Sequence, residues 1–189
     1  IDEIKLNLSN IFIFEIIVVD DFSDDGSYDK IKKKHPDVIL IRNIKNMGQS
    51  FSIYYGVHAS NYNDIVTLDG DGQNPPKDIS KIANIYFSSN YKLVGGLRLN
   101  RKDNAIKKIS SKIANKIRSF VLNDKCIDTG CSLKIFNKTY FLNLPFFNGM
   151  HRFLPALFLA YGCETYYIEV GHRARSKGKS KYGTIDRLI

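Results

Sequence analysis

Short apolar runs that alternate with helix-like segments constrain the fold of this chain more than any other feature. Four short runs are predicted to be strands, and the first of them is a β-branched run with the pattern of a strand that is buried on both faces. They are Glu15–Asp20, Val38–Arg42, Asp64–Asp69 and Leu93–Leu97. Because helix-like segments separate them, we expect parallel βαβ units with right-handed crossovers. The sequence therefore predicts a single α/β domain with a mostly parallel sheet flanked by helices.

The segments between these strands carry helix signals. The turn cluster Asp21–Gly26 precedes a helix that is expected to end at His35, with Ser23 or Asp24 as its cap. The first residues, up to Asn10, have the pattern of a helix end. Further helices are expected at about residues 46–59, 75–88, 104–122 and 151–161, and further strands at Cys131–Phe136 and Glu164–Val170.

Acidic side chains follow two of the predicted strands. Asp20 and Asp21 end the first strand, and Asp69 and Asp71 end the third. Ligands of parallel α/β sheets bind beyond the carboxyl ends of the strands. Both acidic clusters therefore lie where such a fold places its ligand.

The segment Ile65–Pro76 reads IVTLDGDGQNPP and carries the most distinctive of these clusters. Two aspartates one residue apart offer hard oxygen ligands, which suit Mg²⁺ or Mn²⁺ that also hold the phosphates of a substrate. The intervening glycines allow the backbone to approach a ligand closely. A polar turn between a strand and a helix would contain the same residue types, so the motif alone leaves both interpretations open.

The charge of the chain indicates an anionic partner. Its formal net charge is +9 and its isoelectric point is about 9.4. Such a balance is typical of proteins that bind nucleic acid, a phosphorylated substrate or an acidic membrane surface. The segment from Gly171 to Ile189 contains six Lys and Arg residues against one acid. A solvated charge run would show the same composition.

Four motifs now stand in order: VVDDFSDDGS, LDGDGQNPP, DTGCSLKIF and GHRARSKGKSKYG. Together they resemble the family 2 glycosyltransferases of GT-A fold, specifically the polyprenyl-phosphate sugar transferases similar to dolichyl-phosphate mannose synthase. The resemblance covers nearly the whole chain. The family's first strand, with its nucleotide-holding turn, has no counterpart here. We therefore expect a GT-A sheet whose first strand is missing, in a sequence truncated at both ends.

The resemblance implies a donor side. Asp20 and Asp21 would contact the base or ribose of the nucleotide, or else cap the next helix. Gly48 would turn backbone N–H groups toward the nucleotide at a helix start, together with Gln49. The metal on the donor diphosphate, Mg²⁺ or Mn²⁺, would be held by Asp69, Asp71 and Gln73. Asp69 would also contact the nucleotide, and Asp71 would also act in catalysis.

The resemblance also implies an acceptor side. Asp128 would be the second catalytic residue and would orient the acceptor, although a turn aspartate before a strand would look the same. Lys134 stands where many relatives carry Arg. The residues expected to bind an acceptor phosphate are Lys134, Arg152, Arg173, Arg175, Ser180 and Lys181. His151 could join them, or could be a core histidine.

One absence bears on the acceptor. From Thr129 to Cys163 the sequence contains no Asp or Glu. A sugar hydroxyl needs a carboxylate base to remove its proton, whereas a phosphate is already ionised and needs cations to bind it. This composition favours a phosphate acceptor.

The expected function is an inverting, metal-dependent transfer of a sugar from a GDP- or UDP-linked donor to a polyprenyl phosphate. Residues 1–170 would form the catalytic domain, and residues 171–189 a basic loop that closes on the acceptor and leads to the cytoplasmic face of a membrane. One alternative is a glycosyltransferase that acts on a saccharide hydroxyl. A more distant one is a basic α/β module that binds nucleic acid.

Overall fold

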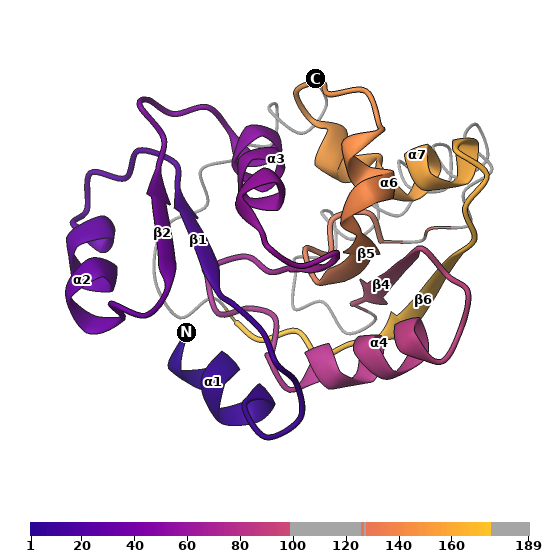
Figure 1. Ribbon diagram of the computed structural model, residues 1–189, viewed down its shortest axis with the longest axis horizontal. Coiled ribbons are helices and arrows are strands. Elements are labelled where there is room, and N and C mark those ends of the chain that lie inside the picture. The colour runs from indigo at the N-terminus through magenta and orange to yellow at the C-terminus, as the bar shows by residue number, and fades with distance from the viewer. Residues whose placement is uncertain (99–125, 127, 175–189) are drawn as a thin grey trace.

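The structure is a computed structural model, and it describes residues 1–98, 126 and 128–174. Helices and strands alternate along most of this range (Figure 1). In chain order the described elements are α1 (Asp2–Leu8), β1 (Ile17–Asp20), α2 (Ser27–Lys34), β2 (Ile39–Arg42), α3 (Gln49–Ala59), β3 (Asp64–Thr67), α4 (Asp78–Phe87), β4 (Leu93–Leu97), β5 (Lys134–Asn137), α6 (Lys138–Leu142), the 3-10 helix η1 (Met150–Arg152), α7 (Leu154–Ala160) and β6 (Thr165–Glu169).

The described strands form two hydrogen-bonded ladders. β1 and β2 pair in parallel, with Asp20 opposite Arg42 at their carboxyl ends. The second ladder has the order β3-β5-β4-β6. In it β4 and β6 are parallel, whereas β5 runs antiparallel to both β3 and β4. The predicted α/β fold is confirmed, and β5 is the antiparallel member of its sheet.

The division between the ladders falls where a doubly wound fold has its first strand. In the strand order 3-2-1-4-5-6 the first strand lies at the centre, between the second and the fourth. Here β1 and β2 take the places of the second and third strands, and β3 takes the place of the fourth. The described strands therefore fit this order, except that none of them pairs with both β1 and β3.

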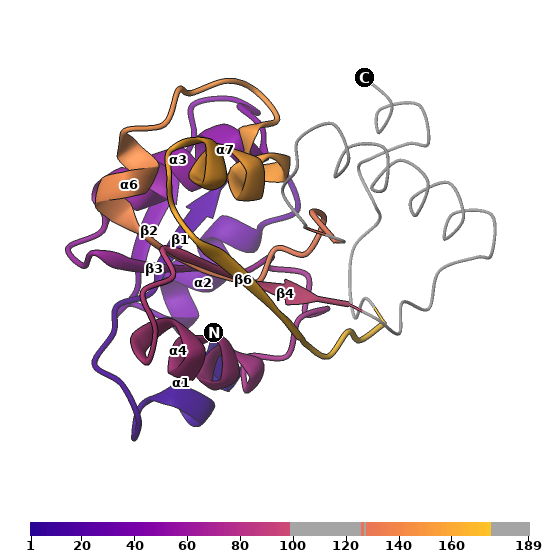
Figure 2. The same cartoon turned by 90° about the vertical axis from the view of Figure 1, so that its right-hand side faces the viewer.

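Helices cover both faces of the second ladder. Figure 1 shows α1 and α4 on one side and α3, α6 and α7 on the other, and Figure 2 shows the same layers from the side. Successive strand residues point to opposite faces. In β4, Val94 accordingly packs with Ile82 of α4, whereas Leu93 packs with Phe141 of α6. Burial of each such side chain contributes about 1.5–3 kcal/mol.

The position of α3 is set by close contact with β1. A Cβ atom added at Gly56 of α3 would lie 3.2 Å from Cγ2 of Val19, so a side chain at this position would require Val19 or the helix to move by a few tenths of an ångström. α2 packs beside β2. As a result, the first turn of α3 lies beside the carboxyl end of β1, at the ligand-binding edge of the fold.

The predicted cap of α2 is wrong. Neither Ser23 nor Asp24 caps this helix, which instead begins after Gly26. Gly26 has a φ of 74°, a left-handed conformation that residues with a side chain rarely adopt. Asp25 supports the turn, because its Oδ1 accepts a hydrogen bond from the Ser27 amide at 2.9 Å.

The predicted strand Cys131–Phe136 begins later than expected, at Lys134. It leads directly into α6, a short helix that the sequence analysis did not predict. Asn137 caps α6, since its Oδ1 accepts hydrogen bonds from the amides of Thr139 and Tyr140 at 3.0 and 3.3 Å. A cap residue that is also the last residue of a strand gives no separate helix signal.

The helix predicted at residues 151–161 is divided. A 3-10 turn, η1, precedes α7, and Pro155 lies in the first turn of α7, where its missing N–H costs no hydrogen bond. The helix predicted at residues 104–122 lies outside the described residues.

Candidate active site

Asp21 joins the end of β1 to the start of α3. Its Oδ1 accepts hydrogen bonds from Asn43 Nδ2 at 2.8 Å and from the Met47 amide at 2.7 Å. Its Oδ2 accepts one from the Gly48 amide at 2.9 Å. Asp21 therefore does not cap α2, and both of its oxygens hold the loop that leads into α3. Its predicted contact with a nucleotide stays a prediction.

Asp20 is buried beneath the same edge. Its Oδ2 accepts a hydrogen bond from the Ser23 amide at 3.2 Å and lies 3.3 Å from Nε of Arg42. The Arg42 guanidinium also stacks on the rings of Phe22 and Tyr28, at 5.5 and 5.1 Å from their centroids. Phe22 has a φ of 60°, so the turn after β1 is backbone-strained at a bulky residue.

Gln49 connects this edge to the predicted metal site. As the first residue of α3 it donates a hydrogen bond from Nε2 to Oδ1 of Asp69 at 2.8 Å. The preceding Gly48 has a φ of 85°, which turns the chain into the helix. The expected helix start at residue 46 is therefore a turn, and the helix begins at Gln49 itself.

Asp69 and Asp71 lie in the turn that follows β3. Burial raises the pKa of Asp69, and the negative charge of Asp71 raises it further, while Ser132, Lys134 and Arg98 act in the opposite direction. Oδ1 of Asp71 accepts a hydrogen bond from the Gln73 amide at 3.0 Å. Two carboxylates that repel one another in a partly buried turn favour a bound cation between them, so these residues fit a divalent metal.

No group of three or more His, Cys, Asp or Glu side chains arranged for a metal ion occurs in the part of the chain that the structure describes. The two aspartates alone are a small ligand set. A Mg²⁺-like ion commonly takes one or two carboxylates, and waters and substrate phosphates complete its coordination. The site therefore suits a metal that binds together with a phosphorylated ligand.

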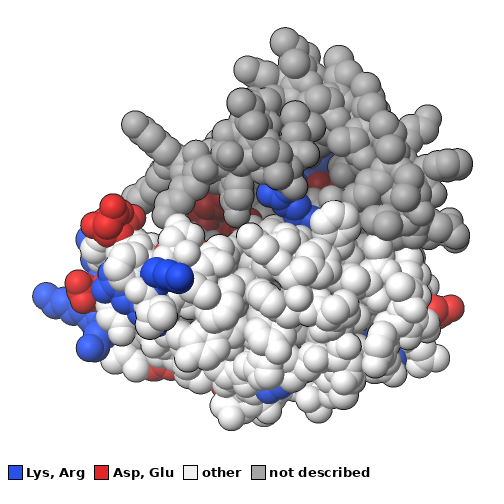
Figure 3. Space-filling model, turned by 90° about the horizontal axis from the view of Figure 1, so that it is seen from above, with Lys and Arg blue, Asp and Glu red and all other residues white. Residues whose placement is uncertain are grey.

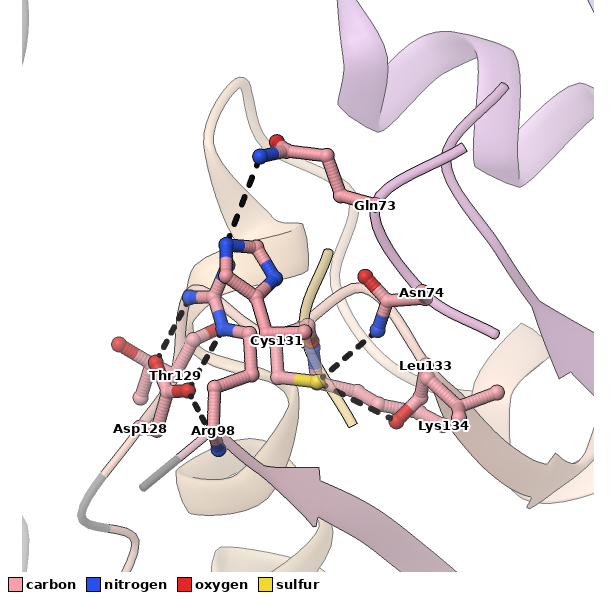
Figure 4. Close-up of polar contacts among 9 residues, drawn as sticks. Gln73, Asn74, Arg98, Asp128, Thr129, Cys131, Leu133 and Lys134 are labelled. Carbon is pink, nitrogen blue, oxygen red and sulfur yellow. Dashed lines mark hydrogen bonds and ion pairs between the residues drawn. The ribbon is translucent and has the colours of Figure 1, made fainter. Parts of the chain in front are cut away.

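Asp128 forms a buried ion pair that the sequence analysis missed. Nε and Nη2 of Arg98 donate to its Oδ2 and Oδ1, both at 2.8 Å, and the Arg98 amide donates to Oδ2 at 3.1 Å (Figure 4). The side chains are only 10% and 9% exposed. Burial acts to lower the pKa of Arg98, but the bonds to Asp128 outweigh it and raise the pKa.

Lys134 lies under the loop that follows Asp128 rather than on an open surface. Its Nζ donates to the carbonyl oxygens of Thr129 and Cys131, and the residue is 5% exposed. Burial lowers its pKa, against the opposing charges of neighbouring acids and thiols. In this structure the ammonium supports the loop, which corrects the expectation that it faces an acceptor phosphate.

The start of the last motif is docked on the turn that carries the aspartates. The Arg173 amide donates to the Gln73 carbonyl at 2.8 Å, and the Gly171 amide donates to Oδ2 of Asp78 at 2.7 Å. Nε2 of Gln73 lies 3.4 Å both from Nε2 of His172 and from the Arg173 carbonyl oxygen. Gln73 also lies close above Asn74 in Figure 4. His172 and Asn74 are further members of the site that the sequence analysis did not single out.

The side chain of Arg173 points elsewhere. Its Nη1 and Nη2 donate to the two carboxylate oxygens of Glu3 in α1, at 3.0 and 2.8 Å. Both side chains are almost half exposed, so the pair contributes little to stability. The expectation that the guanidinium faces an acceptor is wrong for this structure, in which the backbone of Arg173, and not its side chain, reaches the aspartate turn.

His151 is not a cation in this fold. Burial, together with the charges of Arg152 and Lys134, lowers its pKa to about 4. Its Nδ1 lies 2.7 Å from Oγ of Ser50, and the same Oγ accepts a hydrogen bond from the Gly149 amide at 3.0 Å. The hydroxyl therefore donates its proton to Nδ1 of a neutral imidazole. Of the two interpretations of His151, the core histidine is the one observed.

Of the remaining residues predicted to bind the acceptor phosphate, the structure describes one. Arg152 ends η1 and is half-buried. The predicted residues Arg175, Ser180 and Lys181 lie outside the described residues, as does most of the predicted loop 171–189.

The basic charge of the chain is concentrated in two sequence segments. Residues 99–125 and 175–189 contain 13 of the 28 Lys and Arg residues but only three of the 19 acids. The rest of the chain thus has slightly more acids than bases. Accordingly, the described residues on the face in Figure 3 are mostly uncharged. They do not form the continuous basic face that the nucleic-acid alternative predicts.

Two cavities found among the described residues do not include the aspartates. One, of about 340 Å³, lies between α1 and the residues before β1 and β2, and is lined by Phe12, Glu15 and Asp37 among others. The other, of about 320 Å³, lies beside Lys81, Glu169 and His172. Asp69 and Asp71 are partly buried in the turn after β3.

Comparison with known proteins gives a consistent result. Residues 5–144, roughly three quarters of the chain, match the sequence family described as Glycosyl transferase family 2. The matched range includes the acidic clusters after β1 and β3, the Arg98–Asp128 pair and β5.

Two curated proteins are similar in sequence to most of this chain. The chain is 32% identical over 177 residues to the undecaprenyl-phosphate 4-deoxy-4-formamido-L-arabinose transferase of Aeromonas hydrophila, covering 90% of this chain and 53% of that protein. It is 33% identical over 177 residues to the dodecaprenyl-phosphate galacturonate synthase of Rhizobium johnstonii, covering 90% of this chain and 52% of that protein. The chain thus spans about half the length of the curated relatives it matches.

Solved structures share the fold. Glucosyl-3-phosphoglycerate synthase from Mycobacterium tuberculosis, in complex with Mn²⁺, uridine diphosphate and phosphoglyceric acid, superposes with a TM-score of 0.70. Its sequence identity is 14%, over 100% of this chain and 68% of that one. This likeness supports the GT-A architecture. Among the described residues, no helix combines the length and hydrophobicity needed to cross a bilayer.

Proposed function

The chain belongs to glycosyltransferase family 2, and from this premise we propose that it transfers a sugar from a nucleotide-sugar to a polyprenyl phosphate. The names of its curated relatives support this acceptor, since each is a transferase or synthase of an undecaprenyl- or dodecaprenyl-phosphate sugar. The reaction would form a bond between the sugar's anomeric carbon and a phosphate oxygen of the lipid. The bond to the nucleoside diphosphate breaks in the same in-line step, which inverts the configuration.

The donor side would be organised by the turn after β3. Asp69 and Asp71, with Gln73 beside them, would hold Mg²⁺ or Mn²⁺, which when bound supplies positive charge to the departing diphosphate. Asp20, Asp21 and Gly48 would adjoin the nucleotide at the neighbouring strand end. Support for Mn²⁺ comes from the structural neighbour that binds it together with uridine diphosphate.

One observation carries the proposal. At the carboxyl end of β3, Asp69 and Asp71 lie close enough for the charge of Asp71 to raise the pKa of Asp69. A pair of acids that repel one another at this edge suits a metal-bound diphosphate, because a bound cation would relieve the repulsion. A saccharide hydroxyl would instead need a base, and the Asp128 carboxylate is engaged by the two-pronged contact with Arg98.

The basic segments would serve the membrane side of the reaction. A polyprenyl phosphate is embedded in a bilayer, and surplus Lys and Arg attract a chain to anionic lipid. The segments 99–125 and 175–189 carry that surplus. We place the chain at the cytoplasmic face of the membrane, where residues Arg152, Arg175, Ser180 and Lys181 would contact the acceptor phosphate.

Transfer of radiolabelled sugar from a panel of UDP- and GDP-sugars to undecaprenyl phosphate tests this function. We expect Asp71→Ala to reduce labelling by at least 100-fold, because the departing diphosphate loses its metal. Asp29→Ala, which removes an exposed carboxylate of α2, is the matched control and should retain activity. Undiminished labelling in Asp71→Ala would rule out the metal role, and labelling of a saccharide without any lipid phosphate would favour the hydroxyl acceptor.

A further inference from the structure

Gln49 links two strand ends that would otherwise be independent. It begins α3, 20 residues before Asp69, and its carboxamide donates a hydrogen bond to the Asp69 carboxylate. We propose that Gln49 is a positioning residue, which holds the Asp69 carboxylate in the orientation that a divalent metal requires, and that Asp21 fixes Gln49 by anchoring the start of α3. This inference depends on the proposed metal site at Asp69 and Asp71.

The contact itself is well suited to orient a ligand. The distance from Nε2 of Gln49 to Oδ1 of Asp69 is 2.8 Å, a hydrogen bond of ordinary length to a charged acceptor. A bond to one oxygen restricts the rotation of the carboxylate plane, and this rotation decides where the second oxygen points. Groups that orient metal ligands in this way commonly matter almost as much as the ligands.

Gln49 is in turn held from the other strand. Asp21, at the end of β1, binds the amides of Met47 and Gly48 with its two oxygens, at 2.7 and 2.9 Å. Gly48 then closes the first turn of α3, because its carbonyl accepts hydrogen bonds from the Ser52 amide and hydroxyl, both at 3.1 Å. The first residue of the helix therefore has a defined position relative to β1.

The rest of α3 packs against both ladders of the sheet. The helix is pressed on β1 at Gly56, where an added Cβ would lie 3.2 Å from Val19. On its other side Val57 packs into the core that contains Phe136 of β5. Since β5 is bonded directly to β3, α3 bridges the two ladders of the divided sheet, and the Gln49–Asp69 bond is the polar part of that bridge.

The chemistry of the side chain matters as well. A neutral amide donates a hydrogen bond without adding charge, so both negative charges of the aspartate pair stay available to a cation. A lysine at this position would compete with the metal, and a glutamate would repel Asp69. Glutamine is thus the side chain that can hold the carboxylate without neutralising it.

Binding of Mn²⁺ to the 189-residue chain, in the presence of UDP and separately of GDP, provides the test. Electron paramagnetic resonance of free Mn²⁺ gives the affinity, and calorimetry without metal gives the affinity of each nucleotide. We expect Gln49→Ala to weaken Mn²⁺ binding by about 10–100-fold, the usual effect of removing a group that orients a metal ligand. Gln49→Glu should weaken it at least as much. Nucleotide binding without metal and the melting temperature should change little.

Two further variants separate the roles. Asp21→Asn keeps the size of the anchor but turns an amide donor toward a backbone N–H, so it should also weaken Mn²⁺ binding, to a smaller extent. Asn84→Ala removes an exposed carboxamide from α4 and is the matched control. It should leave Mn²⁺ affinity unchanged.

The outcomes distinguish the inference from the function on which it depends. If Asp69→Ala and Asp71→Ala abolish Mn²⁺ binding while Gln49→Ala leaves it unchanged, the positioning role is overturned and the metal site stands. If neither aspartate variant alters binding, or the unmodified chain binds no Mn²⁺ with either nucleotide, both are overturned. If Gln49→Ala lowers the melting temperature, and weakens metal-free nucleotide binding by the same factor as Mn²⁺ binding, the role of Gln49 is structural and the inference fails.

Discussion

The hydrogen bonds around Ser50 decide the charge of a histidine. Ser50 is almost completely buried, and its hydroxyl accepts from the Gly149 amide while it contacts Nδ1 of His151. A protonated imidazole would present a donor to this hydroxyl and would lie near the positive charges of Arg152 and Lys134. Protonation of His151 therefore opposes folding.

This arrangement predicts a pH dependence of stability. In the unfolded chain His151 binds a proton below a pKa of about 6.5, whereas in the folded chain its pKa is about 4. The unfolded state therefore takes up a proton first as the pH falls, and stability decreases between these two values. From pH 7 to pH 5 we expect the free energy of unfolding to fall by about 1–2 kcal/mol because of His151.

Urea denaturation at both pH values measures this change. In His151→Gln the contribution of this residue should be absent, so the variant should lose about 1–2 kcal/mol less than the unmodified chain between pH 7 and pH 5. His58→Gln, which removes an exposed histidine from the last turn of α3, is the control. An identical pH dependence in His151→Gln and the unmodified chain would contradict the proposed neutral state.

The residues that the sequence analysis found and missed differ in how far apart they lie along the chain. Asp69 and Asp71 form a local motif, and their position at the end of a predicted strand indicated a site. Arg98 reaches Asp128 across 30 residues, and nothing near Arg98 distinguishes it from any Arg after a strand. A pairing of this kind becomes visible only once β4 and β5 are adjacent.

Helices and strands, too, were predicted well where nearby residues determine them and poorly where distant residues do. The runs at β1 and β2 were predicted closely, because β-branched residues mark them. The bounds predicted for β4 are those observed, although only one of its five residues is β-branched. The direction of β5 was not, since an apolar strand reads the same whether its neighbours are parallel or antiparallel. The first turn of α3 was placed too early, because the hydrogen bonds that hold Met47 and Gly48 outside the helix come from Asp21, which is distant in the sequence.

At the scale of elements, Gly171 predicts how closely the last motif must lie on α4. A Cβ atom at Gly171 would be 3.0 Å from Cγ of Pro75 and 3.1 Å from Oδ2 of Asp78. Gly171→Ala should therefore displace the segment from α4, break its amide bond to Asp78 and pull Arg173 away from Gln73. We expect a loss of about 1–3 kcal/mol in the free energy of unfolding and a sugar-transfer rate at least tenfold lower.

Urea denaturation and the labelling assay measure the two effects separately. Gly162→Ala is an informative comparison, because no atom lies within 4 Å of its added Cβ, although its φ of 77° makes that change strained as well. It should lower stability but retain the specific activity of the folded fraction. Full activity of Gly171→Ala at the temperature where it is folded would show that docking of this segment is not required for transfer.

The whole molecule divides its charge unequally. The described residues nearly balance, with 15 Lys and Arg residues against 16 acids, whereas residues 99–125 and 175–189 account for the entire positive surplus. The sequence-level inference of an anionic partner therefore concerns these two segments. It could be drawn from composition alone, but the location of the surplus relative to the sheet could not.

This distribution predicts where attraction to an acidic lipid surface originates. Each Lys near such a surface contributes about 1 kcal/mol, and the effect is lost when salt shortens the Debye length. Substitution of Lys107 and Lys108 by Gln should weaken binding to vesicles of 30% phosphatidylglycerol, measured by cosedimentation, by roughly tenfold or more at 0.1 M salt. Substitution of Lys32 and Lys33 by Gln removes the same charge from α2 and should change binding less than twofold. Because attraction decays within about 10 Å at this ionic strength, position and not net charge decides the result. Equal losses in the two double variants would instead mean that the chain responds to its overall charge, and the assignment of a membrane-facing role to the basic segments would be wrong.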